Sequence, residues 1–501
     1  MDYSKLSKEE LLELVIKQQK EIQEKDEKYD DLEAKFYEVQ KERDEYLKEL
    51  EKVKEAKAIS RAKMFARKSE IRKNTFNEAE ETKEKEEASS NKGRKVGSKN
   101  FDYEYLSNHV DETIYLEPKD IDESCVYIGE DISYKISWIP GRFKITKIIS
   151  KKYVSNDGKI HQQIKDDPFP HSICTPSFAS QIMKDKFLLG VPYYRQAQYY
   201  YDEGVKLSRQ DLCNYQLRAT EILKKYYERL KYHLINNHAK VICADETTQK
   251  LVKEKRTGYI WVYLTSFYDN PIYIYEAALD RKATNAIEFL KDYKGYLLTD
   301  AYPGYGKVPN VINCYCWVHA RRNFMDIIKA LDAKQKAVSK SQKMVDMIDD
   351  LLHLEKDWRD NLLPPNEIKN KRNSKDYLAK LDDIKDFLDN IDASPSSPLG
   401  KARDYMLKRW DGFTNYLKDG HVEMTNNISE RAVKPFVIDR KNFLFSFTKN
   451  GADSSAIYFS IQQTARANGF DPGEFTEMLL TKLRNDSTDE EIDALMPWNI
   501  K

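Results

Sequence analysis

The order of predicted strands and helices between residues 239 and 325 constrains the fold more than any other feature of the sequence. The segments KVICADETTQKL, GYIWVYLTSF and PIYIYEAAL have the composition of strands, and short turns connect them. We therefore expect an antiparallel meander. A helix over TNAIEFLKDY then crosses over to a strand in GYLLTDAYPGY, and INCYCWVH is predicted as a fifth strand. The predicted order is three strands, a helix and two further strands.

This order of elements predicts that two aspartates meet on adjacent strands. It is the element order of the ribonuclease-H-like fold, in which an acid in the first strand and one at the end of the fourth meet on adjacent strands. Asp245 and Asp300 occupy those places. Two Mg²⁺ ions about 3.5–4 Å apart, held by carboxylate oxygens, can activate an attacking oxygen and stabilise the leaving 3′-oxygen of a phosphodiester. A third carboxylate must then approach from a helix packed on the sheet, and Glu430 is the candidate.

Glu430 also has two plain structural interpretations. Asn427 and Glu430 fit a capping box, and Glu430 with Lys434 fits an ion pair between residues i and i+4 of a helix. The spacing alone excludes neither. Glu246 is a competing acid, but strand alternation directs its side chain to the face opposite Asp245. We therefore leave Glu246 out of the predicted site.

The flanking segments predict a multidomain α+β chain, because 501 residues exceed what one core normally organises. Residues 1–56 carry an a/d heptad pattern that predicts a self-associating coiled coil, with a single charged helix as the alternative. Residues 57–101 begin as a basic helix and continue into a polar linker that we expect to be disordered. Residues 102–170 read as a small β-rich module. Residues 171–238 have a helix-turn-helix-like layout, which is also common in plain helical bundles.

The second half of the chain is predicted to return to the catalytic core after a long insertion. Residues 239–325 form the first part of the ribonuclease-H-like core, and residues 326–420 a helical insertion that either contacts DNA or is purely structural. Residues 421–450 contain the helix that bears Glu430, and residues 451–501 form a C-terminal helical region.

Charge is balanced over the whole chain, with 83 basic and 83 acidic residues, so attraction to nucleic acid must come from local patches. The alternative for each basic segment is a solvated face or an ion pair within the protein. The candidate DNA-binding residues are Lys63, Arg67, Lys68, Arg94, Lys95, Lys253, Lys255, Arg256, His319, Arg321, Arg322, Arg431, Lys434, Arg440 and Lys441.

Seven motifs, in order, carry a resemblance to a known family. They are KMFARKSE, DETTQKL at Asp245, LLTDAYPGY at Asp300, CWVHARRNF, TNNISERAVKPFVIDRKNFLFSF around Glu430, SIQQTARANGFDPGEF and LMPWN. With them the chain resembles the IS66 family of bacterial insertion-sequence transposases, of the DDE class. The resemblance covers nearly everything after about residue 60. It implies that Asp245, Asp300 and Glu430 are the catalytic, metal-binding acids.

The resemblance also implies cofactors and partners. It implies two Mg²⁺ ions, which Mn²⁺ can replace, and DNA as terminal repeats and target. The heptad pattern of residues 1–56 predicts a homo-oligomer formed through the coiled coil. Small accessory proteins of the same element are a further candidate partner, and the sequence does not decide whether they are needed. The chain departs from the family where many relatives carry a cysteine-rich zinc module. That region holds only Cys125, with Cys174 well beyond it, so we expect no zinc. Cys314 and Cys316 are expected to be small core residues on one strand face.

The sequence thus predicts a DNA transposase that cuts at element ends and joins the 3′-OH to target DNA. The alternatives are a structure-selective DNA nuclease on the same fold and a transposase-derived DNA-binding repressor. The N-terminus lacks an apolar signal segment, and no run reaches the length of a membrane span. We therefore expect no membrane partner and a reducing compartment, the bacterial cytoplasm, in association with the nucleoid.

Overall fold

The computed structural model describes residues 167–500 continuously. It also describes residues 143–147, the strands β1 (Lys152–Val154) and β2 (Ile160–Gln162), and the single positions Lys8, Lys17 and Lys35. The chain divides into two compact units, one of residues 69–165 and the other of the remaining residues. In the first unit β1 and β2 pair antiparallel. The predicted coiled coil, basic helix and linker, and most of the predicted β-rich module, lie outside the described residues.

A five-stranded mixed sheet forms the centre of the larger unit. Its strands are β3 (Val241–Leu251), β4 (Arg256–Thr265), β5 (Tyr273–Ala278), β6 (Tyr296–Thr299) and β7 (Ile312–Tyr315), in the spatial order β5-β4-β3-β6-β7. β3, β4 and β5 pair antiparallel, whereas β6 and β7 run parallel to β3. The predicted meander and crossover are confirmed, and the protein is a mixed α/β protein.

The prediction for the fifth strand was wrong at its end. The strand stops at Tyr315, and helix α8 (Trp317–Ile328) begins two residues later. Trp317 is fully buried, and its indole N–H donates to the carbonyl of Phe413 at 2.8 Å. The apolar run at this point suits a strand and a buried helix equally well, so the sequence did not show where the strand ends. The contact that fixes Trp317 joins residues 96 positions apart.

Helices cover the sheet on its faces and at one edge. Helix α7 (Ala283–Leu290) stacks Phe289 on Tyr263 of β4, with ring centroids 3.8 Å apart, and α15 (Asn427–Phe443) packs along β3. At the β5 edge, backbone N–H groups donate to hydroxyls of α16 (Lys449–Ala467), from Tyr275 to Ser460 at 2.8 Å and from Tyr273 to Thr464 at 3.0 Å. The edge of the sheet is therefore closed by a helix.

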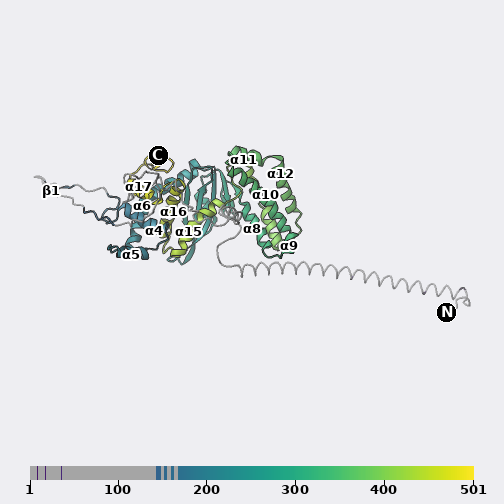
Figure 1. The fold of residues 1–501 in the computed structure, drawn as a ribbon, viewed down its shortest axis with the longest axis horizontal. Helices are drawn as coiled ribbons and strands as arrows, with labels where there is room; N and C mark the ends of the chain where they lie inside the picture. Colours follow the sequence, from purple (N-terminus) through teal and green to yellow (C-terminus); the bar gives the residue numbers. More distant parts are fainter. Residues whose placement is uncertain are drawn as a thin grey trace, which may run out of the picture. The chain divides into compact units, whose positions relative to one another are not determined.

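One group of helices gathers at the β5 end of the sheet, as Figure 1 shows. It contains α4 (Pro176–Phe187), α5 (Tyr193–Asp202), α6 (Arg209–His233) with its extension η2 (Leu234–His238), α16, α17 (Pro472–Lys482) and α18 (Asp489–Asp493). α5 and α6 follow the predicted helix-turn-helix layout, with Gly204 in the turn and Ser208 in a capping box with Asp211. The apolar face of α6 is buried against α16, so α6 helps to form the core.

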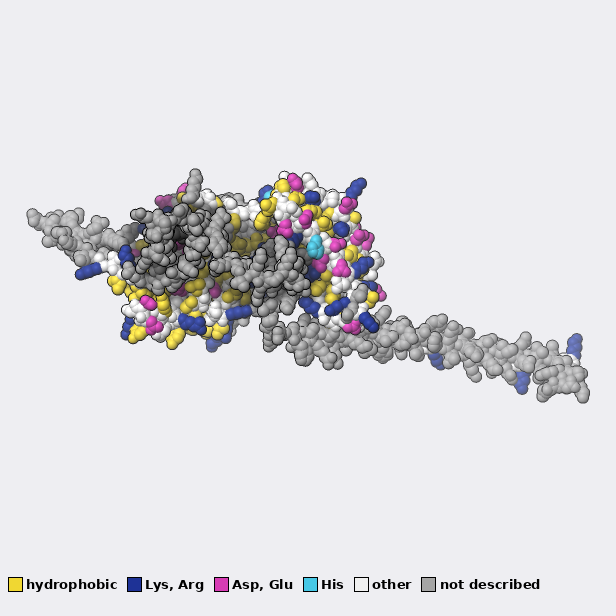
Figure 2. All heavy atoms as spheres, in the orientation of Figure 1, with side chains coloured by type: hydrophobic (Ala, Val, Ile, Leu, Met, Phe, Trp, Pro, Cys, Tyr) yellow, Lys and Arg dark blue, Asp and Glu magenta, His cyan; other side chains and the backbone are white. Residues whose placement is uncertain are grey.

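A second group of helices lies at the other end of the sheet in Figure 1. It follows α8 in the chain and ends just before α15. Its members are α9 (Ala333–Ala337), α10 (Lys340–Asp360), α11 (Pro365–Arg372), α12 (Lys375–Asp389), α13 (Pro398–Leu407), α14 (Trp410–Thr414) and η4 (Asn415–Lys418). None of the described helices is long and apolar enough to cross a membrane. On the face drawn in Figure 2, basic and acidic side chains of the described residues are interspersed.

Candidate active site

Asp245 and Asp300 lie at matching positions of two neighbouring parallel strands. Cys243 of β3 is paired with Leu298 of β6, and each aspartate follows its strand partner by two residues. One Asp245 carboxylate oxygen accepts the N–H of Glu246 at 2.8 Å, and one Asp300 oxygen accepts the N–H of Tyr302, also at 2.8 Å. The pairing register therefore places both acids at the same level, just beyond the last pair of the β3–β6 ladder.

The helix that carries Glu430 starts beside Asp245. Asn426 is the N-cap position and Asn427 the first residue of α15, which agrees with the prediction that these asparagines begin the helix. The side-chain amide of Asn426, which is 1% exposed, donates to the carbonyl of Ala244 at 2.9 Å. Ala244 immediately precedes Asp245, so this one contact fixes the start of α15 next to the acid on β3.

Glu430 is held by two residues of α8. Its Oε1 accepts a hydrogen bond from Arg322 at 3.2 Å and lies 3.4 Å from Nε2 of His319. The N-cap residue makes no side-chain capping bond, so the capping box considered from the sequence is not formed. His319 and Arg322 were predicted to contact phosphate, and the structure brings both to the predicted acid site.

The three acids interact electrostatically although they come from three separate elements. Burial is the largest cause that raises the pKa of Asp245 to about 8, and the nearby charges of Glu246, Asp300 and Glu430 contribute to the same rise. Asp245 keeps some solvent-accessible surface, but the protein closely surrounds its carboxyl. A carboxyl that is difficult to ionise among like charges is typical of functional sites.

The donor set suits a hard divalent cation, because carboxylate oxygens are its preferred ligands and a cation would favour the ionised form of Asp245. The three carboxylates are not yet arranged in the geometry of a metal site. Within residues 167–500 and the other described positions, no group of three His, Cys, Asp or Glu side chains is placed to hold a metal ion. The three carboxylates are the right type of ligand for a divalent cation. To bind one, the Glu430 side chain would have to rotate away from Arg322 and His319.

Glu246 has a separate, structural set of partners. Arg281 donates to its Oε1, with the Nε contact at 2.7 Å, and the hydroxyl of Tyr305 donates to Oε2 at 2.7 Å. Arg281 in turn stacks on the ring of Tyr302, 3.9 Å from its centroid. These partners occupy both carboxylate oxygens of Glu246. Its charge still raises the pKa of Asp245, an effect that strand alternation did not suggest.

Besides Arg322, two further predicted DNA-binding arginines have partners inside the protein. Arg321 forms a forked ion pair with Asp349 of α10, in which the contact to Oδ2 measures 2.7 Å. Arg440 donates to the carbonyl and hydroxyl of Thr248 and to the hydroxyl of Thr247 on β3. Both guanidinium groups attach a helix to its neighbour, and the sequence could not show this because both contacts are long-range.

The remaining basic candidates fall into two sets. Lys63, Arg67, Lys68, Arg94 and Lys95 lie outside the described residues. A second, exposed set lies on the β3–β4 hairpin and on α15. It contains Lys253, Lys255, Arg256, Arg431, Lys434 and Lys441.

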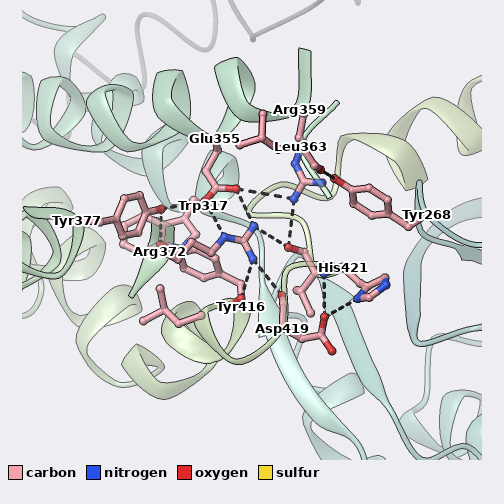
Figure 3. Close-up of polar contacts among 12 residues, drawn as sticks. Tyr268, Trp317, Glu355, Arg359, Leu363, Arg372, Tyr377, Tyr416, Asp419 and His421 are labelled. Atoms are coloured by element: carbon pink, nitrogen blue, oxygen red, sulfur yellow. Dashed lines mark hydrogen bonds and ion pairs between the residues drawn. The ribbon is translucent and has the colours of Figure 1, made fainter. Parts of the chain in front are cut away.

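A buried ion pair ties the insertion to the chain that leads into α15, as Figure 3 shows. Arg372 of α11 donates to both carboxylate oxygens of Glu355 at 2.7 and 2.6 Å. It also donates to the carbonyls of Tyr416, Asp419 and Val422 at 2.7, 3.0 and 2.8 Å. Val422 lies four residues before Asn426. The insertion therefore fixes the path of the chain into the helix of Glu430.

The insertion also reaches Asp300. The hydroxyl of Tyr405 on α13 donates to the Asp300 carbonyl at 2.8 Å, just before Ala301, whose φ of 67° turns the chain sharply after β6. Sequence reasoning missed both Arg372 and Tyr405, because neither lies in a recognisable motif. The insertion thus contacts two of the segments that carry the predicted acids.

The fold and the site together define a mixed α/β protein with interacting, partly buried acids, of which Asp245 lies within β3 and Asp300 directly follows the adjacent strand β6. A family model described as Transposase IS66 family matches residues 171–454, more than half of the chain. The chain therefore belongs to the IS66 family of transposases, as the motifs predicted.

The curated relatives that match most of the chain come from Sinorhizobium fredii. The uncharacterized protein y4hP is 29% identical over an alignment of 402 positions, which covers 75% of this chain and 71% of that protein. The uncharacterized protein y4jD is 26% identical over an alignment of 446 positions, which covers 82% of this chain and 84% of the relative. The similarity extends well beyond the segment that the family model matches.

Proposed function

We propose that this protein is a DDE-class DNA transposase, which cuts DNA at the ends of an insertion sequence and joins the free 3′-OH to target DNA. The single observation that carries the proposal is the position of three acids from separate elements: Asp245 and Asp300 follow paired residues of β3 and β6, and Asn426 ties the start of the Glu430 helix to β3. The sheet order, with a meander followed by two parallel strands, supports a ribonuclease-H-like core.

Each acid has a role that follows from its position. Asp245 and Asp300 project from rigid neighbouring strands, and Glu430 approaches from α15, which Asn426 fixes to β3. Divalent cations held by these carboxylates, Mg²⁺ or Mn²⁺, would activate the attacking oxygen and stabilise the leaving 3′-oxygen. Arg322 and His319 hold Glu430, and they would neutralise phosphate charge once Glu430 rotates away from them.

DNA and a second copy of the chain are the proposed partners. Paired element ends must be brought together, so a dimer or larger assembly formed through residues 1–56 is the expected active form. Three carboxylates alone would repel DNA, which is a polyanion. The exposed lysines and arginines of α15 and the β3–β4 hairpin supply positive charge that offsets this repulsion.

The experiment incubates the full chain with a labelled element end, target DNA and Mg²⁺. Joined product is expected. Cut product without joining would identify a nuclease, and binding without either would identify a repressor. Separate variants Asp245→Ala, Asp300→Ala and Glu430→Ala should each abolish cutting and joining but retain binding to the element end. The control Glu288→Ala removes an exposed acid of α7 and should behave as the parent. Full activity in any of the three acid variants would overturn the proposed site.

A further inference from the structure

The connection between α15 and α16 exposes an unusual set of large apolar side chains. Phe445 is 44% exposed, Phe447 64% and Leu444 65%. Single exposed apolar residues are common in proteins, but three within four positions are not explained by packing. Leu444 has a φ of 63°, a conformation rarely adopted by branched residues, which turns the chain out of α15.

These rings stand on a rigid support. The connection lies beside the end of β3, where Ser446 donates its N–H to the Lys250 carbonyl at 3.0 Å, and the carbonyls of Ser446 and Phe447 accept the N–H groups of Val252 and Lys253 at 3.1 and 2.8 Å. The Ser446 hydroxyl accepts a bond from Gln249 at 2.8 Å, so it faces the sheet. Because side chains alternate along an extended segment, Phe445 and Phe447 share the opposite, exposed side.

The hairpin that is hydrogen-bonded to this connection carries several basic residues. Lys253, Lys255 and Arg256 are exposed on the β3–β4 hairpin, and a groove of about 700 Å³ is lined by Lys250, Lys255, Arg256, Arg440 and Leu444.

The nearest acid of the hairpin is Glu254, and its carboxylate accepts the N–H of Lys449 at 2.9 Å in the first turn of α16. Lys253, Lys255 and Arg256 outnumber this single acid, so the hairpin carries a net positive charge. We call Phe445, Phe447, Lys253, Lys255 and Arg256 the ring-and-hairpin surface.

The position of this surface relates it to the acids. α15 begins beside Asp245 and ends at the ring-and-hairpin surface, and its 17 residues span about 25 Å at 1.5 Å per residue. That length corresponds to about seven steps of a nucleic-acid strand at the spacing of about 3.4 Å per strand. A DNA strand bound at the acids can therefore continue to the surface.

We propose that the ring-and-hairpin surface binds unpaired DNA bases adjoining the end that is cut and joined. Bases stack on Phe445 and Phe447, and the basic residues of the hairpin contact the phosphates between them. Exposed flat rings beside cations are the usual platform for single strands, whereas a duplex keeps its base faces stacked internally. This inference rests on the proposed function, because it concerns the DNA of that same reaction.

The test measures binding of the full chain, without metal, to labelled oligodeoxythymidine and to a fully paired hairpin duplex. Phe447→Ala should weaken single-strand binding about five- to a hundredfold, which corresponds to the roughly 1–3 kcal/mol of a stacked base, and leave duplex binding unchanged. Phe447→Trp should retain single-strand binding, whereas Phe447→Leu should not. The control Phe267→Ala removes a ring that is 60% exposed beyond the other end of β4.

The charge contribution is tested by salt titration. The double variant Lys255→Ala/Arg256→Ala should lower the magnitude of the log K versus log[salt] slope by about 1.4, since each phosphate contact to a single strand contributes roughly 0.7. Phe447→Ala should leave the slope unchanged, because stacking releases no counterions.

Three outcomes would overturn the inference. Equal losses of duplex and single-strand binding would make the surface a general DNA contact. Unchanged DNA binding with a lower mass in sedimentation would make it an interface between copies of the chain. Normal affinity in Phe447→Leu would show that apolar contact suffices without stacking. None of these measurements requires catalysis, so a failure of DNA joining with intact single-strand binding would overturn only the proposed function.

Discussion

Replacing Arg372 should loosen the segment that leads into the Glu430 helix. Arg372 is fully buried and donates to Glu355 and to three backbone carbonyls between residues 416 and 422. The variant Arg372→Met leaves the carboxylate of Glu355 buried, with the Tyr377 hydroxyl at 3.1 Å and Arg359 at 3.7 Å as remaining partners. Removing one member of a buried ion pair typically costs about 3–5 kcal/mol.

The cost should appear locally, so hydrogen exchange is the suitable assay. At about 1.4 kcal/mol per tenfold change, the backbone amides of residues 410–424 should exchange roughly two to nearly four orders of magnitude faster. DNA joining should fall with it, because the start of α15 depends on this segment. The double variant Arg372→Met/Glu355→Leu removes both charges and should recover part of the protection.

A surface ion pair provides the matched control. Lys385 and Asp389 form a pair one turn apart on α12, and Lys385→Ala should change stability by less than about 1 kcal/mol. The reasoning would be refuted if Arg372→Met exchanged no faster than Lys385→Ala at residues 410–424. It would also be refuted if the amides of Arg372→Met/Glu355→Leu exchanged faster than those of Arg372→Met. That result would mean that the unpaired, buried Glu355 carboxylate does not destabilise the single variant.

Three further predictions concern charge and assembly. Hydrogen bonding from Arg229 lowers the pKa of Asp493 to about 2, so the stabilisation by this carboxylate is present above pH 4 and is lost as the pH falls through 2. Asp493→Asn should therefore cost about 1 kcal/mol at pH 7, discounted for solvent screening, and much less at pH 2, as measured by urea unfolding. On duplex DNA, Lys434→Ala should lower the magnitude of the log K versus log[salt] slope by roughly 0.9, whereas Arg321→Ala should not, because Asp349 already holds that guanidinium. Deletion of residues 1–53 should abolish self-association and leave a soluble catalytic region, and an unchanged mass in sedimentation would contradict this.

The sequence determined the local elements of this protein. Alternation and turn residues sufficed for β3, β4 and β5, because a half-buried strand and a short turn each leave a pattern in a few consecutive residues. The helix start at Asn426 and Asn427 was predictable for the same reason. The motifs also gave the family and the three candidate acids, since those residues lie within short, characteristic segments.

Only the tertiary structure decided how these pieces meet. The coupling of Asp245 with Asp300 and Glu430 depends on the strand register and on the Asn426 contact to β3, both of which join distant parts of the chain. Arg321 and Arg322 are adjacent in sequence, yet one pairs with Asp349 and the other with Glu430. Neighbouring side chains on a helix point in directions about 100° apart, so the packing around α8, and not the local sequence, selects the partner of each.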